Sequence, residues 1–193
     1  MRKSDKNAYF RTFFKNHSLK RILLLSDTHG CTEPDIIKHF DNADELWHAG
    51  DWSNKALFEI MEKTQKPVRG VWGNVDGQEL RTILPLHNQF SIGGIRFWMT
   101  HIGGYPGQYN PKIKPLLDRD PPDVFICGHS HILKVQRDAK YKNMLTINPG
   151  AAGRHGFHLM RTMIKFEIEN GKLQNMAVIE LGKRTAGILP DIQ

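Results

Sequence analysis

The chain has 193 residues, enough for one domain with a buried core that needs neither disulfides nor a structural metal. Its net charge is +7, but seven of the 27 lysines and arginines lie in the first 21 residues, and the remainder is nearly balanced. Nucleic acid is therefore not the expected partner, because a basic face on the folded domain would be needed. We expect a basic N-terminal extension, residues 1–20, and one domain, residues 21–193.

The extension carries aromatic residues at the spacing of one helix face, namely Tyr9, Phe10, Phe13 and Phe14. This spacing predicts a short amphipathic helix that packs on the domain or on a second subunit, so a homo-oligomer is one expectation. A transit peptide is the alternative interpretation of the extension.

The two cysteines, Cys31 and Cys127, form no C-x-x-C pair, so we expect neither a zinc ribbon nor a disulfide framework. A reducing compartment is the default for such a chain. No apolar run approaches the ~20 residues that span a bilayer. We expect a cytoplasmic protein without a membrane partner.

The first half alternates strand-like and helix-like stretches. Apolar runs at residues 21–26, 45–49 and 67–72 each end at a turn with glycine or aspartate, and helix-like stretches at 34–40 and 55–63 follow the first two. This alternation is typical of βαβ units in a largely parallel sheet. Ligands of such sheets bind outside the carboxyl ends of the strands.

The second half is richer in strands. Residues 87–92 and 95–100 flank Gly93-Gly94, which is a good hairpin signal. Further strands are expected at residues 124–127, 135–138, 144–148, 162–168 and 172–180, with a hairpin turn at 169–171 and a short helix at 111–119. The expected fold class is α/β, with two mixed sheets packed together and flanked by helices as a four-layer α/β/β/α sandwich.

Seven polar side chains follow these strands in five short clusters. They are Asp27 and His29 in SDTHG, Asp51 in HAGDW, Asn74 in WGNVD, His101 in THIGG, and His129 with His131 in CGHSH. Carboxylate and amide oxygens and imidazole nitrogens are ligands of divalent metals. Each cluster alone also fits an ordinary turn, but five of them at strand ends favour one shared metal site. Asp51 has two oxygens and is able to bind one ion with each.

In this order, the patterns Asp-x-His, Gly-Asp, Gly-Asn-x-Asp, His and Gly-His-x-His resemble the calcineurin-like metallophosphoesterase superfamily. GNVDG, INPGAAG and the small size resemble its small single-domain phosphodiesterase branch, the YfcE-type proteins. The resemblance covers residues 21–180. It implies a metal-dependent phosphoesterase, above all a phosphodiesterase (a phosphoric diester hydrolase) for small or nucleotide-like phosphodiesters.

The resemblance also implies a dinuclear metal centre. One ion would be held by Asp27, His29, Asp51 and His131, and the other by Asp51, Asn74, His101 and His129. Asp51 would bridge ions roughly 3.5 to 4 Å apart, and a hydroxide between them would be the nucleophile, with Asn74 and His101 beside it as catalytic residues. Mn²⁺ is favoured by the resemblance, while Zn²⁺, Fe²⁺ and Ni²⁺ suit the same ligands.

Two positions depart from the family pattern. Many relatives have a histidine after the asparagine, which is taken to protonate the leaving oxygen, and this chain has Val75. We therefore expect substrates with a good leaving group, such as aryl phosphodiesters. Ile102 stands where relatives have glycine, so the loop that follows His101 is expected to differ. That loop either shapes substrate choice or is a rigid surface loop.

Some neighbours of the ligands are further candidates. His48 would orient Asp51 or be an ordinary buried histidine, and Asp76 would support the ligands or cap a turn. Arg154, with His155 beside it, would contact a phosphate, although an exposed arginine on a turn is the commoner case. Four other histidines, His17, His39, His87 and His158, show no ligand spacing and are interpreted as ordinary residues.

Two other functions remain open. A retromer subunit of this fold has lost metal ligands and serves as a protein-binding scaffold, so the fold alone does not decide for an enzyme. All seven ligand positions are filled in this chain, which favours an enzyme. The second alternative is a nuclease that uses the basic extension to hold phosphates.

Overall fold

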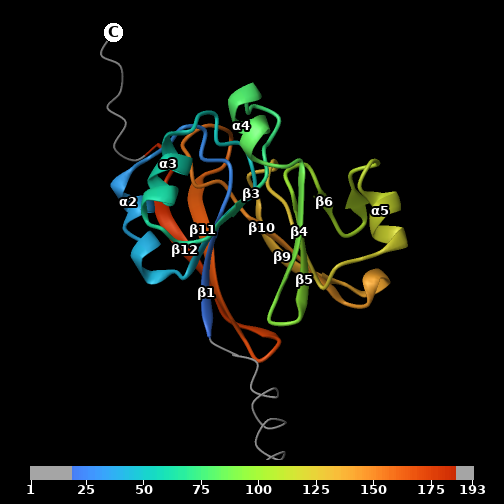
Figure 1. Cartoon of the computed structure of the whole chain (residues 1–193). Coiled ribbons are helices and arrows are strands. Elements are labelled where there is room, and N and C mark those ends of the chain that lie inside the picture. The colour runs from blue at the N-terminus through green and yellow to red at the C-terminus, as the bar shows by residue number, and fades with distance from the viewer. Residues whose placement is uncertain (1–18, 186–193) are drawn as a thin grey trace, which may run out of the picture.

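Two five-stranded sheets pack face to face in the computed structural model, which describes residues 19–185 (Figure 1). Helices α2 and α3 lie outside the first sheet, and α5 lies outside the second. The predicted sandwich of two mixed sheets flanked by helices is confirmed. The expected helix around Phe10 and Phe13 lies outside the described residues.

The first sheet joins both ends of the described chain. In spatial order its strands are β12 (Lys172–Lys183), β11 (Met160–Glu169), β1 (Lys20–Leu25), β2 (Glu45–His48) and β3 (Val68–Gly70). β1, β2 and β3 are parallel, as the βαβ pattern predicts, and β11 pairs antiparallel with β1. Asn170 and Gly171 turn β11 into β12 with φ values of 51° and 74°, the left-handed pair that a tight hairpin favours.

The second sheet is also mixed. In spatial order its strands are β4 (His87–Ile92), β5 (Ile95–Thr100), β8 (Val124–Ile126), β10 (Met144–Pro149) and β9 (Leu133–Asp138). β5, β8 and β10 are parallel neighbours, and both edge strands are antiparallel. A separate two-stranded hairpin, β6 (Gly104–Tyr105) and β7 (Gln108–Tyr109), follows β5.

The helices are short. They are α2 (Pro34–Ile37), α3 (Ala56–Lys63), α4 (Gln78–Ile83) and α5 (Lys114–Arg119), with 3₁₀ turns η1 (Phe40–Asn42) and η2 (Ala139–Tyr141). The helix expected over residues 34–40 stops at Ile37. The helix expected over 111–119 begins at Lys114, because Asn110 first closes a turn by accepting the backbone N–H of Lys112. None of the helices in the described part of the chain is long and apolar enough to cross a membrane.

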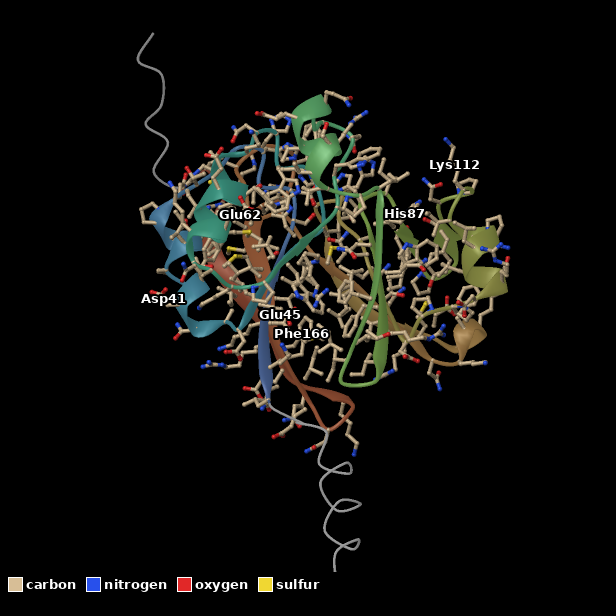
Figure 2. All side chains as sticks on the ribbon, in the orientation of Figure 1. Asp41, Glu45, Glu62, His87, Lys112 and Phe166 are labelled. Carbon is tan, nitrogen blue, oxygen red and sulfur yellow. The ribbon has the colours of Figure 1, made fainter. Side chains whose placement is uncertain are left out.

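The two faces of β1 are buried in two different cores, as strand alternation predicts. Ile22 and Leu24 of β1 face the second sheet, while Leu23 and Leu25 pack beneath the helices on the other side. Trp47 of β2 is part of the core between the sheets, with ring centres of Phe90 and Phe97 at 5.0 Å and of Phe166 (labelled in Figure 2) at 5.5 Å, all edge-on. Edge-on aromatic pairs add about 0.5–1.5 kcal/mol each beyond their buried area.

The topology brings five loops to one edge of the sandwich. The parallel strands β1, β2 and β3 end at the same edge of their sheet, and β5 and β8 end together in the other. Residues after these strands pair through the backbone: Asp27 N–H donates to the carbonyl of Gly50 (2.9 Å), and Gly128 N–H to that of His101 (3.0 Å). The seven predicted ligands lie on these five loops.

Candidate metal centre

Six of the seven predicted ligands form two neighbouring groups. One group is Asp27, His29 and His131, and the other is Asp51, His101 and His129. Within each group the possible donor atoms lie within 4.8 Å of one another. His131 Nε2 is 3.2 Å from Asp27 Oδ1, and His101 Nε2 is 3.2 Å from Asp51 Oδ2. Each group thus has the carboxylate and imidazole donors of a divalent metal site.

Asp51 lies between the two groups. Its Oδ2 atom is 3.2 Å from His101 Nε2 in its own group and 3.9 Å from His29 Nε2 in the other. Asn74, the seventh predicted ligand, lines the same cavity of about 490 Å³ as Asp51, His29 and His129. Asp27 Oδ1 has the same pair of distances, 3.2 Å to His131 Nε2 and 3.9 Å to His101 Nε2, so the distances suit either carboxylate as a shared ligand, and the family pattern assigns that role to Asp51.

The backbone around the ligands is strained. Five of the seven predicted ligands have a left-handed conformation, Asp27 (φ 53°), His29 (48°), Asp51 (60°), His129 (68°) and His131 (58°). Residues with a side chain rarely adopt this region, and such strain gathers at functional sites. The loops are held by backbone hydrogen bonds such as that from His29 N–H to the carbonyl of Asp51 (3.0 Å).

Two glycines allow the loops to approach this closely. A Cβ atom at Gly73 would lie 2.1 Å from Asp51 Oδ1, and one at Gly128 would lie 2.0 Å from Ser26 Oγ. Neither distance is possible for real atoms. Glycine in GNVD and in CGHSH is therefore a steric requirement of the site.

Asp76 supports the loop that carries Asp51. Its buried carboxylate accepts backbone N–H groups of Gly73 (2.7 Å), Ser53 (2.7 Å) and Asp51 (3.1 Å). Burial raises the pKa of Asp76 despite these hydrogen bonds, which oppose the rise. The carboxylate thus holds the backbone of the Asp51 loop and does not join either ligand group.

His48 acts on the backbone next to Asp51. Its Nδ1 accepts the N–H of Gly50 (3.1 Å), its Nε2 then donates to Thr28 Oγ1 (3.0 Å), and its ring stacks on Trp52 at 3.6 Å. Complete burial keeps the pKa of His48 well below its ordinary value, so the ring is neutral. Both nitrogens are therefore occupied by partners other than the Asp51 carboxylate.

The surroundings of His101 show whether the site suits a bound cation. Its Nδ1 donates to the carbonyl of Ala49 (2.8 Å), while its buried Nε2 has no hydrogen-bond partner and faces Asp51 Oδ2 at 3.2 Å. Burial alone would lower the pKa of His101, but Asp51 and Asp27 outweigh it and raise that pKa. A bare imidazole nitrogen in negative surroundings fits a metal ion, and a carbonyl on the opposite nitrogen is the usual support of a metal-binding histidine.

His158 orients His131, a role that its sequence position does not reveal. Its Nε2 donates to the carbonyl of Gly153 (3.0 Å), and burial lowers its pKa, so its unprotonated Nδ1 accepts a hydrogen bond from His131 Nδ1 (3.3 Å). The other ring nitrogen, His131 Nε2, then faces the ligand group, 3.2 Å from both Asp27 Oδ1 and His29 Nε2. The structure thus gives His158 a contact with a predicted ligand that its spacing in the sequence does not indicate.

Replacing His158 with alanine is therefore expected to weaken the binding of one metal ion about 10- to 100-fold, the usual effect of losing a group that orients a ligand. Calorimetric titration of the metal-free protein with Mn²⁺ measures this. His39→Ala is the matched control, because His39 is a partly buried histidine beside another cavity, near Arg21 and Lys165. Equal affinities in both variants would contradict the role of His158.

Arg154 does not line the cavity at the ligands. Its Nη2 donates to Glu33 Oε2 (2.8 Å) and its Nη1 to the carbonyl of Arg184 (2.8 Å), which turns the guanidinium toward α2 and the end of β12. The hydrogen bonds to the Glu33 carboxylate raise the pKa of Arg154. His155 instead meets the ligands, with its ring centre 4.8 Å from that of His29. The structure thus gives the predicted phosphate contact of Arg154 no support, because Glu33 already holds the side chain.

Residues 21–171 match the family model of the calcineurin-like phosphoesterase superfamily domain. The chain belongs to this superfamily. No curated protein sequence matches the chain.

Solved structures share the fold of this superfamily member at low sequence identity. A novel archaeal phosphodiesterase is 22% identical with a TM-score of 0.63, over 82% of this chain and 99% of that chain. A predicted phosphoesterase from Streptococcus pneumoniae is 18% identical, with a TM-score of 0.61 over 85% and 91% of the two chains. Vps29 from Entamoeba histolytica, in complex with Zn²⁺, is 14% identical, with a TM-score of 0.59 over 84% and 99%.

Proposed function

We propose that this superfamily member is a metal-dependent phosphodiesterase that hydrolyses small or nucleotide-like phosphodiesters. The observation that carries the proposal is the position of Asp51, whose Oδ2 is within 3.9 Å of histidines from both ligand groups. Two divalent ions bound there would activate a water as nucleophile and stabilise charge on the phosphoryl oxygens. Family membership supports phosphoester hydrolysis, and the ligand geometry supports a two-ion centre.

The metal is proposed to be Mn²⁺, with Zn²⁺, Fe²⁺ or Ni²⁺ as alternatives. The donor set contains imidazole, carboxylate and amide groups and no thiolate, so ligand softness does not separate these ions. The Vps29 structure with Zn²⁺ supports zinc as the first alternative.

The cavity relies on metals to attract a phosphate. Among the described residues that line it, none is lysine or arginine, and five are histidines, namely His29, His129, His131, His155 and His158. Burial lowers the pKa of His29 and His129, so these rings are neutral at pH 7. Within this cavity the positive charge that binds phosphate would therefore come from the ions, while Arg81 and Lys112 line an adjoining cavity beside Asn74 and His101.

Val75 explains the preference for diesters with a good leaving group. Its side chain is 45% exposed and lines the cavity beside Asn74 and Asp51. Valine cannot donate a proton to the departing oxygen, so an alcohol of high pKa would leave slowly and a nitrophenolate would leave readily. We infer an aryl or similarly acidic leaving group.

Val75→His is expected to raise turnover of aryl monoesters relative to aryl diesters about tenfold or more, because it restores a proton donor beside the leaving group. Steady-state rates with p-nitrophenyl phosphate and bis(p-nitrophenyl) phosphate measure this ratio. Val75→Gln, which has a similar reach and no titrating proton, is the matched control. An unchanged ratio in Val75→His would place Val75 away from the leaving group.

The proposal is tested by assaying the full chain, loaded with Mn²⁺, on a panel of phosphodiesters and monoesters. Hydrolysis of bis(p-nitrophenyl) phosphate that disappears on chelation and returns with metal is the expected result. A metal-loaded protein that hydrolyses no phosphoester in the panel would refute the proposal.

A protein-binding scaffold is the second candidate, and one observation favours it. Phe157 and Leu159, on the loop after NPGAAG, are almost fully exposed, and Phe157 stands at the rim of the cavity. Exposed apolar side chains of this size are typical of contact surfaces. If the chain is a scaffold, a variant with the predicted metal ligands replaced would still bind the partner. If the chain is an enzyme, the same variant would lose its activity.

A nuclease that uses the basic extension is the third candidate. Deleting residues 1–18 leaves β1 intact, since that strand begins at Lys20. A nuclease of this kind would lose salt-dependent affinity for nucleic acid on this deletion. The proposed phosphodiesterase would keep its rate on small aryl diesters.

A further inference from the structure

A second cavity, of about 330 Å³, adjoins the metal centre. His129, Ser130 and Ile132 line both this cavity and the one over the ligand groups. We call it the tyrosine cavity, defined by Tyr105 and Tyr109 with Ile102, Ile132 and Lys134. A molecule whose phosphate lies at the ligand groups would reach the tyrosine cavity past His129 without leaving the protein surface.

The β6–β7 hairpin that forms one wall is fixed in place. A Cβ atom at Gly103 would lie 2.7 Å from the ring of Phe125, so this glycine packs directly on β8. Cys127 Sγ donates to the carbonyl of Gly104 at 3.2 Å. The hydroxyl of Tyr109 donates to Asp138 Oδ2 (2.8 Å), which anchors the hairpin to the end of β9. The wall is therefore formed before any ligand binds.

The cavity offers apolar and aromatic surface with few free polar groups. The Asn148 amide at its base already donates to the carbonyl of Gly128 (2.8 Å) and to Ser130 Oγ (3.0 Å). Tyr105 donates its hydroxyl to Gln108, and Lys134 Nζ lies over its ring, 3.7 Å from the ring centre. Ile102 and Ile132 are exposed at the cavity, with 38% and 61% of their surfaces accessible.

This surface selects the shape and charge of its ligand. The volume is at the small end of ligand sites, which run from ~300 to 1,000 Å³, so one or two rings fit better than a long chain. A second phosphate would require several free cations, and Lys134 is the one cation that lines the cavity within residues 19–185. A planar aromatic group with little charge matches both constraints.

We propose that the tyrosine cavity binds an aryl or nucleobase group on the ester arm that is not cleaved. This inference rests on the proposed phosphodiesterase function and names its substrate class: phosphodiesters with one aromatic arm retained in the product. Val75 and Asn74, which mark the leaving-group side, do not line the tyrosine cavity. The aromatic arm beside His129 is therefore the one that keeps its bond to phosphorus.

The test uses two diesters with the same leaving group, p-nitrophenyl phenyl phosphate and p-nitrophenyl methyl phosphate. The wild-type chain with Mn²⁺ is expected to prefer the phenyl compound about tenfold in kcat/KM. Ile132→Ala and Tyr105→Ala are expected to reduce that preference toward unity, because they lower kcat/KM for the phenyl compound more than for the methyl compound. Tyr105→Phe should keep the preference, because the ring remains. Val178→Ala, which removes an apolar side chain that is 45% exposed on β12, is the control.

The outcomes are separable. If the wild type hydrolyses neither diester, the phosphodiesterase proposal fails. If it hydrolyses both with no preference, or if Ile132→Ala and Tyr105→Ala lower both rates equally, the phosphodiesterase stands and the tyrosine cavity is not the site of the retained arm. A Tyr105→Ala chain that does not fold leaves Ile132→Ala and Tyr105→Leu to decide the question by the same ratio.

Discussion

Replacing Asp51 with asparagine is expected to lower kcat/KM for bis(p-nitrophenyl) phosphate on the order of 10³-fold or more. Asparagine keeps the size of the side chain and an oxygen that can accept the N–H of Val75, which donates to Asp51 Oδ1 at 3.1 Å. It removes the negative charge that faces His101 and His29. The shared ligand is lost while the fold is retained, and steady-state kinetics with a thermal melt measures both.

Asp44→Asn is the control for this change. Asp44 pairs with Arg21 at the surface (2.8 Å) and belongs to neither ligand group. The kcat/KM of Asp44→Asn should therefore stay within about twofold of the wild-type value. Wild-type activity in Asp51→Asn would contradict the shared position of this carboxylate. A comparable loss in both variants would show that the effect arises from general destabilisation.

Replacing Arg161 with methionine is expected to cost about 2–4 kcal/mol of the free energy of unfolding. The Arg161 side chain is buried, and its guanidinium donates to Asp35 Oδ2 (2.8 Å), Glu33 Oε2 (3.1 Å) and the carbonyl of Ala152 (2.8 Å). Methionine fills the space but leaves that carbonyl and the partly exposed Asp35 carboxylate without their partner, while Glu33 keeps Arg154. Urea unfolding at pH 7 with an unchanged m-value measures the loss.

The Arg161 variant should also lose activity, because the hydrogen bonds of Arg161 extend to the loops that carry the predicted metal ligands. Ala152, which Arg161 holds, donates its N–H to the carbonyl of Ser26 (2.9 Å), and Gly153 N–H donates to that of Asp27 (3.0 Å). Arg119→Met, at an exposed position in α5, is the control and should change stability by less than about 0.5 kcal/mol. Equal free energies of unfolding in the two variants would contradict the stabilising role of Arg161.

Much of the fold was predictable because its strands are long, apolar and bounded by turns. β1 ends in four consecutive apolar residues, 22–25, and Gly93-Gly94 has the left-handed φ values, 59° and 85°, that its hairpin requires. Helix α4 and the β6–β7 hairpin were not predicted. Both are short, and the hairpin owes its place to packing of Gly103 on Phe125, a contact across 22 residues that local sequence does not encode.

The ligand positions were predictable for a related reason. Each predicted ligand directly follows a strand, and parallel strands deliver their ends to one edge, so sequence position alone implied proximity. His158 gave no such signal, because its contact with His131 depends on the loop after NPGAAG folding back onto the loop that carries His131. Arg154 was expected at a phosphate, and its capture by Glu33, 121 residues earlier, is a tertiary contact with no local pattern.

The distinctive features of the chain lie beside the ligands. Val75 provides no proton donor at the leaving group, and Ile102 leads into the hairpin that builds the tyrosine cavity. Together they predict an enzyme that depends on the leaving group for one arm of its substrate and on aromatic contacts for the other.

The central claim is that two metal ions share Asp51, and metal content tests it most directly. The full chain, stripped of metal, reloaded with Mn²⁺ and freed of excess ion, is predicted to hold two ions per chain by elemental analysis. His101→Ala, which removes a ligand from one group only, should hold about one, and His39→Ala should hold two. One ion or none in the wild type, or two in His101→Ala, would contradict the account.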